Sequence, residues 1–315
     1  MADVRARFDG DSDRGQLLLV TALALAVMLV TVALLLNTAI FTENVATRDT
    51  TADGSEAIEL RGEAVAAVGE LIETENRAGD GDPDNVDNAV DAMGPLVDRE
   101  RARHGTVATL SRNGSATSGQ LLRWTNPDSD RPFDDPGTNW TLAESITESR
   151  SFTLELTEIQ ELSDPTDTEI EDKAFGVRFV NESTENRTLY LYEDSEHIVA
   201  ERANETAPPR QQCAIDSGGG STTVDITGDR LSTTDTAVDC YRGLWPTDSP
   251  DAIEFVNGGA ADGTFSLVVD DSASPVSDSA VQNDPAVYSA TVDITYQSQD
   301  LLFETTVRVA PGAPR

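Results

Sequence analysis

The sequence predicts an α+β protein: a single N-terminal transmembrane helix continues into a helical stalk, and an antiparallel, β-rich, sandwich-like extracellular domain follows. Three observations support this. An uncharged apolar run comes first, apolar residues then recur at helical spacing, and from about Arg150 apolar and polar residues alternate. The expected parts are a cytoplasmic leader at 1–15, the transmembrane helix at 16–42, the stalk at 43–110 and the β-rich domain at 111–315.

The apolar run extends from Gly15 to Thr42 and contains no charged residue. About 20 helical residues cross a hydrocarbon core of about 30 Å, so the run is long enough to span a bilayer. Arginines precede it at positions 5, 7 and 14, and such a bias favours a cytoplasmic N-terminus. We therefore expect a single-pass protein of the cell membrane, with the lipid bilayer as a partner and its C-terminal domain outside.

The composition is strongly acidic, with 57 acidic residues against 22 basic ones and a net charge of -35. Only one basic residue is a lysine, Lys173. Such a charge pushes a compact fold apart in ordinary salt, but in molar salt the Debye length falls to about 3 Å. We interpret most carboxylates as a hydrated, salt-adapted surface typical of halophiles. Nucleic acid is not an expected partner, because phosphate contacts need clustered Lys and Arg.

Two helices are predicted after the apolar run. Each has a stripe of apolar residues at intervals that fit the 3.6-residue helical period. The first stripe consists of Ile58, Val65, Val68 and Ile72, and the second of Val86, Val90, Met93 and Val97. Pro95 lies inside the second helix and should kink or end it. The chain's own outer domain is the favoured partner of the first stripe, and a neighbouring subunit is the alternative.

Alternating residues predict the strands of the outer domain. The expected strands are 152–156, 175–179, 188–192, 223–227, 253–256 and 264–269. The clearest pair is a hairpin of 288–296 and 301–309, joined by residues 297–300. Between about residue 106 and residue 139 we expect loops, and the tail at 311–315 should be frayed.

The start of the sequence resembles a known class. Arg14-Gly15-Gln16, directly followed by an apolar helix, is similar to the leader of archaeal type IV pilin-like proteins and archaellins. The resemblance implies cleavage between Gly15 and Gln16, and assembly with other pilin-like subunits or envelope proteins. Val20 stands at the fifth mature position, where bacterial pilins carry a glutamate. As a whole the region resembles uncharacterised haloarchaeal surface proteins of this pilin-like type.

The two cysteines, Cys213 and Cys240, are expected to form a disulfide, which is the default state of paired cysteines in an oxidising compartment. The bond would stabilise the fold by roughly 3–4 kcal/mol in the chain-entropy model. A zinc site is a weaker alternative, because it needs three or four ligands and the chain has only His104 and His197 besides the cysteines. A catalytic thiol also lacks a local signature.

Five Asn-x-Ser/Thr sequons follow the apolar run, and they are consistent with an exposed, N-glycosylated surface. They lie at Asn113, Asn139, Asn181, Asn186 and Asn204.

One acidic turn has partial calcium-loop spacing. Positions 1, 3, 5 and 12 of such a loop correspond to Asp80, Asp82, Asp84 and Asp91. The sixth position should be glycine and the twelfth glutamate, and neither condition holds. A solvated turn that caps the second helix is the preferred interpretation, so no metal site is expected.

No catalytic constellation stands out, and we expect neither enzymatic activity nor a cofactor. There is no G-x-S-x-G motif, and carboxylates are too abundant for any pair to be informative. We interpret Trp124, Trp140 and Trp245 as core or loop anchors rather than a sugar-binding platform. The favoured function is a structural or pilus-like assembly role at the cell surface. A monomeric anchored module that binds a ligand, glycan or calcium is the alternative.

Overall fold

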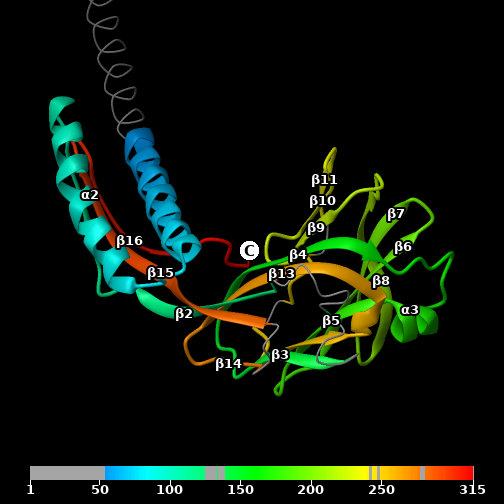
Figure 1. The fold of residues 1–315 in the computed structure, drawn as a ribbon. Coiled ribbons are helices and arrows are strands. Elements are labelled where there is room, and N and C mark those ends of the chain that lie inside the picture. The colour runs from blue at the N-terminus through cyan, green and yellow to red at the C-terminus, as the bar shows by residue number, and fades with distance from the viewer. Residues whose placement is uncertain are drawn as a thin grey trace, which may run out of the picture.

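The computed structural model describes residues 54–124, 133, 139–240, 243–246, 249–276 and 281–314. The predicted leader and span at 1–42, with the Gly15–Gln16 cleavage site, lie outside these residues. Figure 1 shows two regions, which we name the helix–sheet unit and the sandwich. The helix–sheet unit comprises residues 54–112 and 290–309, and the sandwich is built mainly from residues 117–289.

Two helices and three strands form the helix–sheet unit. The helix at 54–78 and α2 (Pro83–Arg103) pack on one face of a narrow antiparallel sheet. That sheet consists of β1 (Val107–Arg112), the C-terminal half of β15 (Val281–Gln297) and β16 (Leu302–Val309). In Figure 1 the red and orange C-terminal strands lie beside the blue and cyan helices, so the unit joins distant parts of the chain.

Helix α2 starts as its sequence dictates but does not end where the proline suggests. Asp82 is the N-cap and accepts a hydrogen bond of 3.0 Å from the Asp84 N–H, and Pro83 fits the first turn. Pro95 is exposed, and the helix continues past it to Arg103, so the expected break does not occur. Gly94 lets the helix approach β1 closely, since an added Cβ would lie 2.6 Å from the Leu110 carbonyl oxygen.

The buried stripe of the 54–78 helix differs from the predicted one. It consists of Ala57, Leu60, Ala64, Val68 and Ile72. Ile58 was expected to be buried but is 68% exposed. Prediction from large side chains overlooked the alanines, which are small enough to let the helix pack closely. The second stripe is confirmed, with Val86 and Val90 buried and Met93 and Val97 partly buried. The helices pack on strands of the same chain, which agrees with the expectation that the first stripe packs on the chain's own outer domain.

One sheet of the sandwich is continuous with the narrow sheet through β15. Within the described residues it has nine strands, in the order β1-β15-β2-β13-β4-β9-β10-β11 with β16 beside β15. The strands not yet bounded are β2 (Thr117–Trp124), β4 (Ser149–Ile159), β9 (Thr222–Asp225), β10 (Arg230–Ser232), β11 (Ala237–Asp239) and β13 (Ala261–Asp270).

The second sheet has seven strands among the described residues, in the order β14-β3-β12-β5-β6-β7-β8. They are β3 (Trp140–Glu144), β5 (Phe175–Val180), β6 (Arg187–Asp194), β7 (His197–Asn204), β8 (Ala207–Asp216), β12 (Ala252–Val256) and β14 (Ser274–Pro275). Two short helices, α3 (Asp167–Lys173) and η1 (Gly258–Ala260), lie in the connections. A capping box of Thr166 and Glu169 starts α3.

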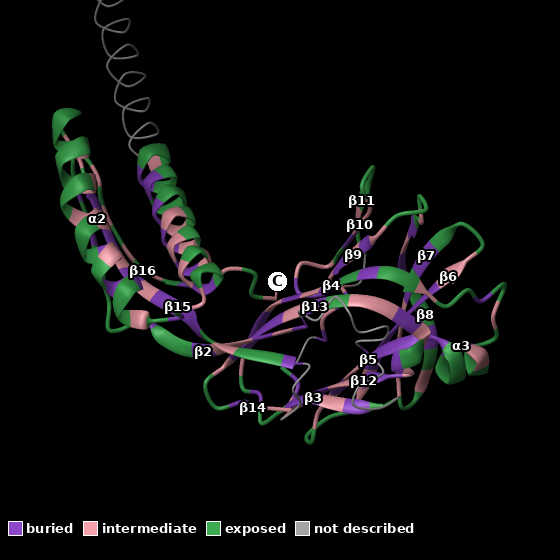
Figure 2. Cartoon of the chain, viewed as in Figure 1, coloured by how far each residue is buried: buried purple, intermediate pink, exposed green. Residues whose placement is uncertain are grey.

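An aromatic cluster fills the space between the sheets. The ring of Phe255 lies 5.1–5.7 Å, centroid to centroid, from the rings of four neighbours: Phe133, Trp140, Phe175 and Phe265. Such edge-on and tilted arrangements are favoured by aromatic quadrupoles. Figure 2 shows that buried residues occur in the strands of both sheets. The predicted strands after Arg150 are confirmed, because their alternating apolar residues form this core.

Three expectations are corrected. The described residues form mainly antiparallel sheets, and their helices pack on strands instead of forming a separate stalk, so the predicted α+β class is wrong. Across the described residues no helix is both long and apolar enough to cross a membrane, which contradicts the predicted single-pass membrane location. Strands β1 and β2 occupy part of the region in which loops were expected. They were missed because Ser, Thr and Gly residues obscure the alternation of apolar and polar residues in their sequences.

Buried polar side chains join the two regions. The Arg150 side chain is fully buried and donates hydrogen bonds of 2.9 Å to the carbonyl oxygens of Val287 and Tyr288, and of 2.8 Å to Glu73. It also donates to the Pro311 carbonyl oxygen at 2.7 Å. Residue 311 is therefore fixed and not frayed as predicted. Burial lowers the pKa of Arg150 from its ordinary value, while hydrogen bonding to Glu73 opposes this shift.

Candidate functional site

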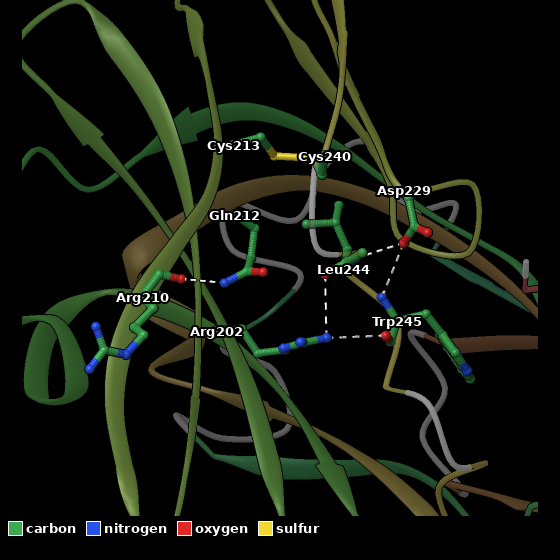
Figure 3. Close-up of a disulfide and its surroundings, with 9 residues drawn as sticks. Arg202, Arg210, Gln212, Cys213, Asp229, Cys240, Leu244 and Trp245 are labelled. Atoms are coloured by element: carbon green, nitrogen blue, oxygen red, sulfur yellow. Dashed lines mark hydrogen bonds between the residues drawn. A yellow bond between two sulfur atoms is a disulfide. The ribbon is translucent and has the colours of Figure 1, made fainter.

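The disulfide lies at the centre of the candidate site. Cys213 in β8 and Cys240 after β11 are joined with an S–S distance of 2.06 Å and a Cα–Cα distance of 4.9 Å. Both cysteines are buried in the sandwich core. The predicted disulfide is thus confirmed, and it ties the end of the small β9-β10-β11 meander to the second sheet (Figure 3).

The segment that follows the disulfide, residues 243–246, is held in place from two sides. The Asp229 carboxylate accepts hydrogen bonds from the backbone N–H groups of Leu244, at 2.6 Å, and Trp245, at 3.4 Å. From the other side Arg202 donates to the carbonyl oxygens of Gly243 and Trp245, both at 3.4 Å (Figure 3). We refer to residues 243–246 as the disulfide loop.

A basic pocket of about 280 Å³ lies near one side of the disulfide loop. Its lining includes Arg187, Arg202 and Arg210, a concentration of positive charge that is unusual in so acidic a chain. Gln212 also lines the pocket, and its amide nitrogen donates a hydrogen bond of 2.5 Å to the Arg210 carbonyl oxygen. The buried Oε1 of Gln212 has no hydrogen-bond partner within the described part of the chain. Sequence reasoning missed this cluster because β6, β7 and β8 each contribute to it.

A larger pocket of about 590 Å³ lies on the other side, where the sandwich meets the C-terminal residues. Its lining includes Glu148 and Ser149 before and at the start of β4, Asp229, Trp245 from the disulfide loop, Tyr288 from β15 and Arg308 from β16. We name it the junction pocket. No local sequence motif predicts this pocket, because its residues come from five separate segments of the sequence.

Electrostatic pairing shapes the junction pocket. Arg308 donates two hydrogen bonds to Glu148, and these hold the pKa of Glu148 below its usual value. Burial, with a smaller effect from the negative charge of Glu148, raises the pKa of Tyr288 to about 12, so the phenol stays neutral. The Arg150 and Arg308 guanidinium groups lie 5.6 and 5.5 Å from the centre of the Tyr288 ring.

The proposed calcium ligands do not converge. Asp82 caps α2, and Asp91 forms a 3.1 Å ion pair with Arg112. Across the described ranges no group of three or more His, Cys, Asp or Glu side chains is placed to hold a metal ion. Asp80 lies in the turn before α2, and Asp84 lies in the first turn of the helix. This agrees with the interpretation of the segment as a turn that caps the second helix.

The sequons occupy different environments. Asn113 and Asn139 are exposed. The Asn113 amide donates to Asp293 at 3.0 Å, and the Asn139 side-chain oxygen accepts a hydrogen bond of 2.8 Å from the Asn257 N–H. The other three are partly buried, and their side-chain oxygens accept hydrogen bonds from nearby backbone N–H groups: Asn181, Asn186 and Asn204. Glycosylation of these positions remains a prediction.

Both histidines lie at the surface. His197 is 3.0 Å from Asp216 on the neighbouring strand, and His104 is 3.6 Å from Glu100 on α2. Trp124 and Trp140 are buried core residues, as expected, while Trp245 is only partly buried and lines the junction pocket.

The comparisons describe only the first part of the chain. Residues 11–138 match the model of a family of unknown function, DUF7261. No curated protein matches the chain. The match includes both long helices, β1 and β2, and it ends before β3. It therefore covers all of residues 54–112, the N-terminal part of the helix–sheet unit.

Proposed function

We propose that this protein has a structural, non-catalytic role and works by pilus-like self-association through the helix–sheet unit. One observation carries the proposal. The large hydrophobic side chains that remain exposed within the described residues all belong to this unit: Ile58, Leu96, Val107 and Leu302. Isolated exposed hydrophobics are ordinary, but their concentration in one region favours a contact surface.

The strand register brings two of these side chains to the same end of the narrow sheet. Val107 and Leu302 both pair with Gln297, from opposite sides of β15. The Tyr296 hydroxyl donates a hydrogen bond of 2.8 Å to the Glu56 carboxylate, so the start of the 54–78 helix also lies at this end of the sheet. Leu96 and Ile58 lie in the halves of their helices nearer this end. We name these four residues the apolar tip.

The strands beside the tip offer a second means of contact. Within the described residues β1 and β16 each pair only with β15, so each has one edge without a strand partner. Unpaired edges are templates for strand pairing with another chain. Association of such acidic subunits requires screening of their mutual repulsion, so we expect it in molar salt and not in dilute salt.

The test is the molecular mass of the full chain in solution, measured by light scattering in molar KCl. The double variant Leu96→Gln, Leu302→Gln should shift the protein to a smaller species. The matched control is Thr236→Gln on the exposed β10–β11 turn, which should leave the mass unchanged. A double variant that associates as the unchanged chain does would contradict the proposal.

The pilin-like leader provides an independent test. Assembly of the kind we propose requires removal of the leader, so the native protein should begin at Gln16. Finding Met1 or Ala2 at the N-terminus of native protein by sequencing would count against a pilus-like mode, even if the chain self-associates.

A further inference from the structure

The junction pocket contains a buried polar group without a hydrogen-bond partner among the described residues. Ser149 is only 4% exposed, and its hydroxyl has no hydrogen-bond partner within the described residues. Tyr288 also lines the pocket and is 4% exposed. A buried hydroxyl without a partner costs free energy, so the Ser149 hydroxyl favours a ligand or solvent that supplies a donor or an acceptor.

Trp245 belongs to the apolar part of the same pocket, together with prolines and alanines of the lining. Trp245 is the one described tryptophan that is not buried, and its ring packs edge-on against Phe179 at 5.2 Å between centroids. Its backbone is anchored by Asp229, and the disulfide fixes the adjoining segment. The indole is therefore held at the pocket wall before any ligand arrives, which lowers the entropic cost of binding.

Charged groups complete the lining. The Asp229 oxygen Oδ1 holds the disulfide loop, whereas Oδ2 accepts no hydrogen bond from the described residues. Glu148 and Arg308 are paired with one another and still present further acceptor and donor capacity to the pocket. With two carboxylates and one guanidinium, the lining does not favour a phosphate or another polyanion.

We propose that the junction pocket binds a neutral saccharide. A pyranose has an apolar ring face, which suits the indole of Trp245, and closely spaced hydroxyls, which can both donate and accept. Ser149, Tyr288 and Arg308 can bond these hydroxyls, and the free oxygen of Asp229 can accept from one. The volume of about 590 Å³ is within the range of small-molecule sites and accommodates one or two sugar units.

Other ligand classes fit less well. A divalent cation is disfavoured because no cluster of three metal-ligating side chains occurs among the described residues. A wholly apolar ligand would leave the Ser149 hydroxyl buried without a partner. The inference does not depend on self-association, since the junction pocket and the apolar tip share no residue.

The test uses the full chain in molar KCl and an array of neutral mono- and disaccharides, including glucose, galactose, mannose and N-acetylglucosamine. Saturable binding should be confirmed by titration calorimetry and by a change in tryptophan fluorescence. Ser149→Ala should weaken binding about fivefold, the effect of one lost hydrogen bond, without lowering the melting temperature, because its hydroxyl has no protein partner. Trp245→Ala should weaken binding at least about tenfold, and Trp245→Phe should restore part of it.

The matched control is Ser118→Ala on the exposed face of β2, which should change neither affinity nor melting temperature. The proposal is overturned if no neutral saccharide on the array binds saturably. Binding that is unaffected by both Ser149→Ala and Trp245→Ala would also overturn it, because the sugar would then occupy another place. Glucuronic acid serves as an acidic comparison: if it binds and no neutral sugar does, the basic pocket is the site and the assignment is wrong.

Discussion

The sandwich and the helix–sheet unit are stabilised differently. The sandwich has an interior of interlocked aromatic rings and a disulfide between two of its segments. The helix–sheet unit is packed mainly with aliphatic side chains, and neither cysteine belongs to it. It also displays large hydrophobic side chains that the sandwich does not display within the described residues. The two regions therefore differ both in how their interiors are packed and in the apolar surface that they expose.

The strongest test of the sandwich is the substitution Phe255→Ala. The side chain is fully buried and contacts four aromatic neighbours, so its loss should destabilise the fold by about 3–5 kcal/mol. Denaturant unfolding in molar KCl measures this effect. The comparison variant Phe303→Ala in the helix–sheet unit should cost clearly less, because Phe303 is only partly buried. Equal effects would remove the contrast between the two interiors.

Arg150→Met tests the connection between the regions. The substitution leaves the carbonyl oxygens of Val287, Tyr288 and Pro311 and the Glu73 carboxylate without this donor, at a cost of about 3–5 kcal/mol. Hydrogen exchange should show lower protection in both regions. The control is Arg103→Met, which removes an exposed pair with Glu100 and should change stability by no more than about 1 kcal/mol. Loss of protection in one region alone would show that Arg150 does not couple them.

Removal of the disulfide should affect the sandwich most. The double variant Cys213→Ser, Cys240→Ser should lower stability by about 3–4 kcal/mol for a loop of 27 residues. The loss of hydrogen-exchange protection should be concentrated at β8 and the disulfide loop. Reduced protein of the original sequence should behave in the same way as the variant. A greater loss of protection in α2 than in β8 would reverse the assignment of the disulfide to the sandwich.

Asn76→Ala tests how the 54–78 helix is attached. The buried amide accepts from the Val287 N–H at 2.8 Å and donates to its carbonyl oxygen at 3.1 Å. Its removal should cost about 1–3 kcal/mol, because both backbone groups stay buried. The comparison variant Asn88→Ala lies on the exposed face of α2 and should be neutral. A neutral Asn76→Ala would mean that water replaces the amide at this junction.

The smallest expected effect is that of Asp82→Ala, which removes the N-cap of α2 and should cost about 1 kcal/mol. Hydrogen exchange in the first turn of α2 measures it. Asp98→Ala, on the exposed part of the same helix, should not reproduce the loss. If it does, the effect reflects charge and not capping.

Sequence reasoning succeeded where a physical signal is local. Alternating residues located β4, β5, β6 and the β15–β16 hairpin, and helical spacing located α2. It failed where the partner is distant in sequence. Nothing in the helical segments indicates that β15 and β16 lie beneath them, and the alanine-containing stripe that packs there has too little hydrophobicity to stand out. Residues of the junction pocket are ordinary in their local context, and only the fold brings Ser149, Asp229 and Arg308 together.

The long strand β15 also constrains how the protein is made. Its first half pairs with β2 and its second half with β1, and Asn76 bonds to its residue Val287, 211 positions later in the chain. At about 5–20 residues per second of synthesis, the helices emerge on the order of ten seconds or more before the strands that cover them. During that interval their apolar stripes have no native partner. The helix–sheet unit therefore closes late in biosynthesis, and the nascent chain is most in need of protection by chaperones before β15 appears.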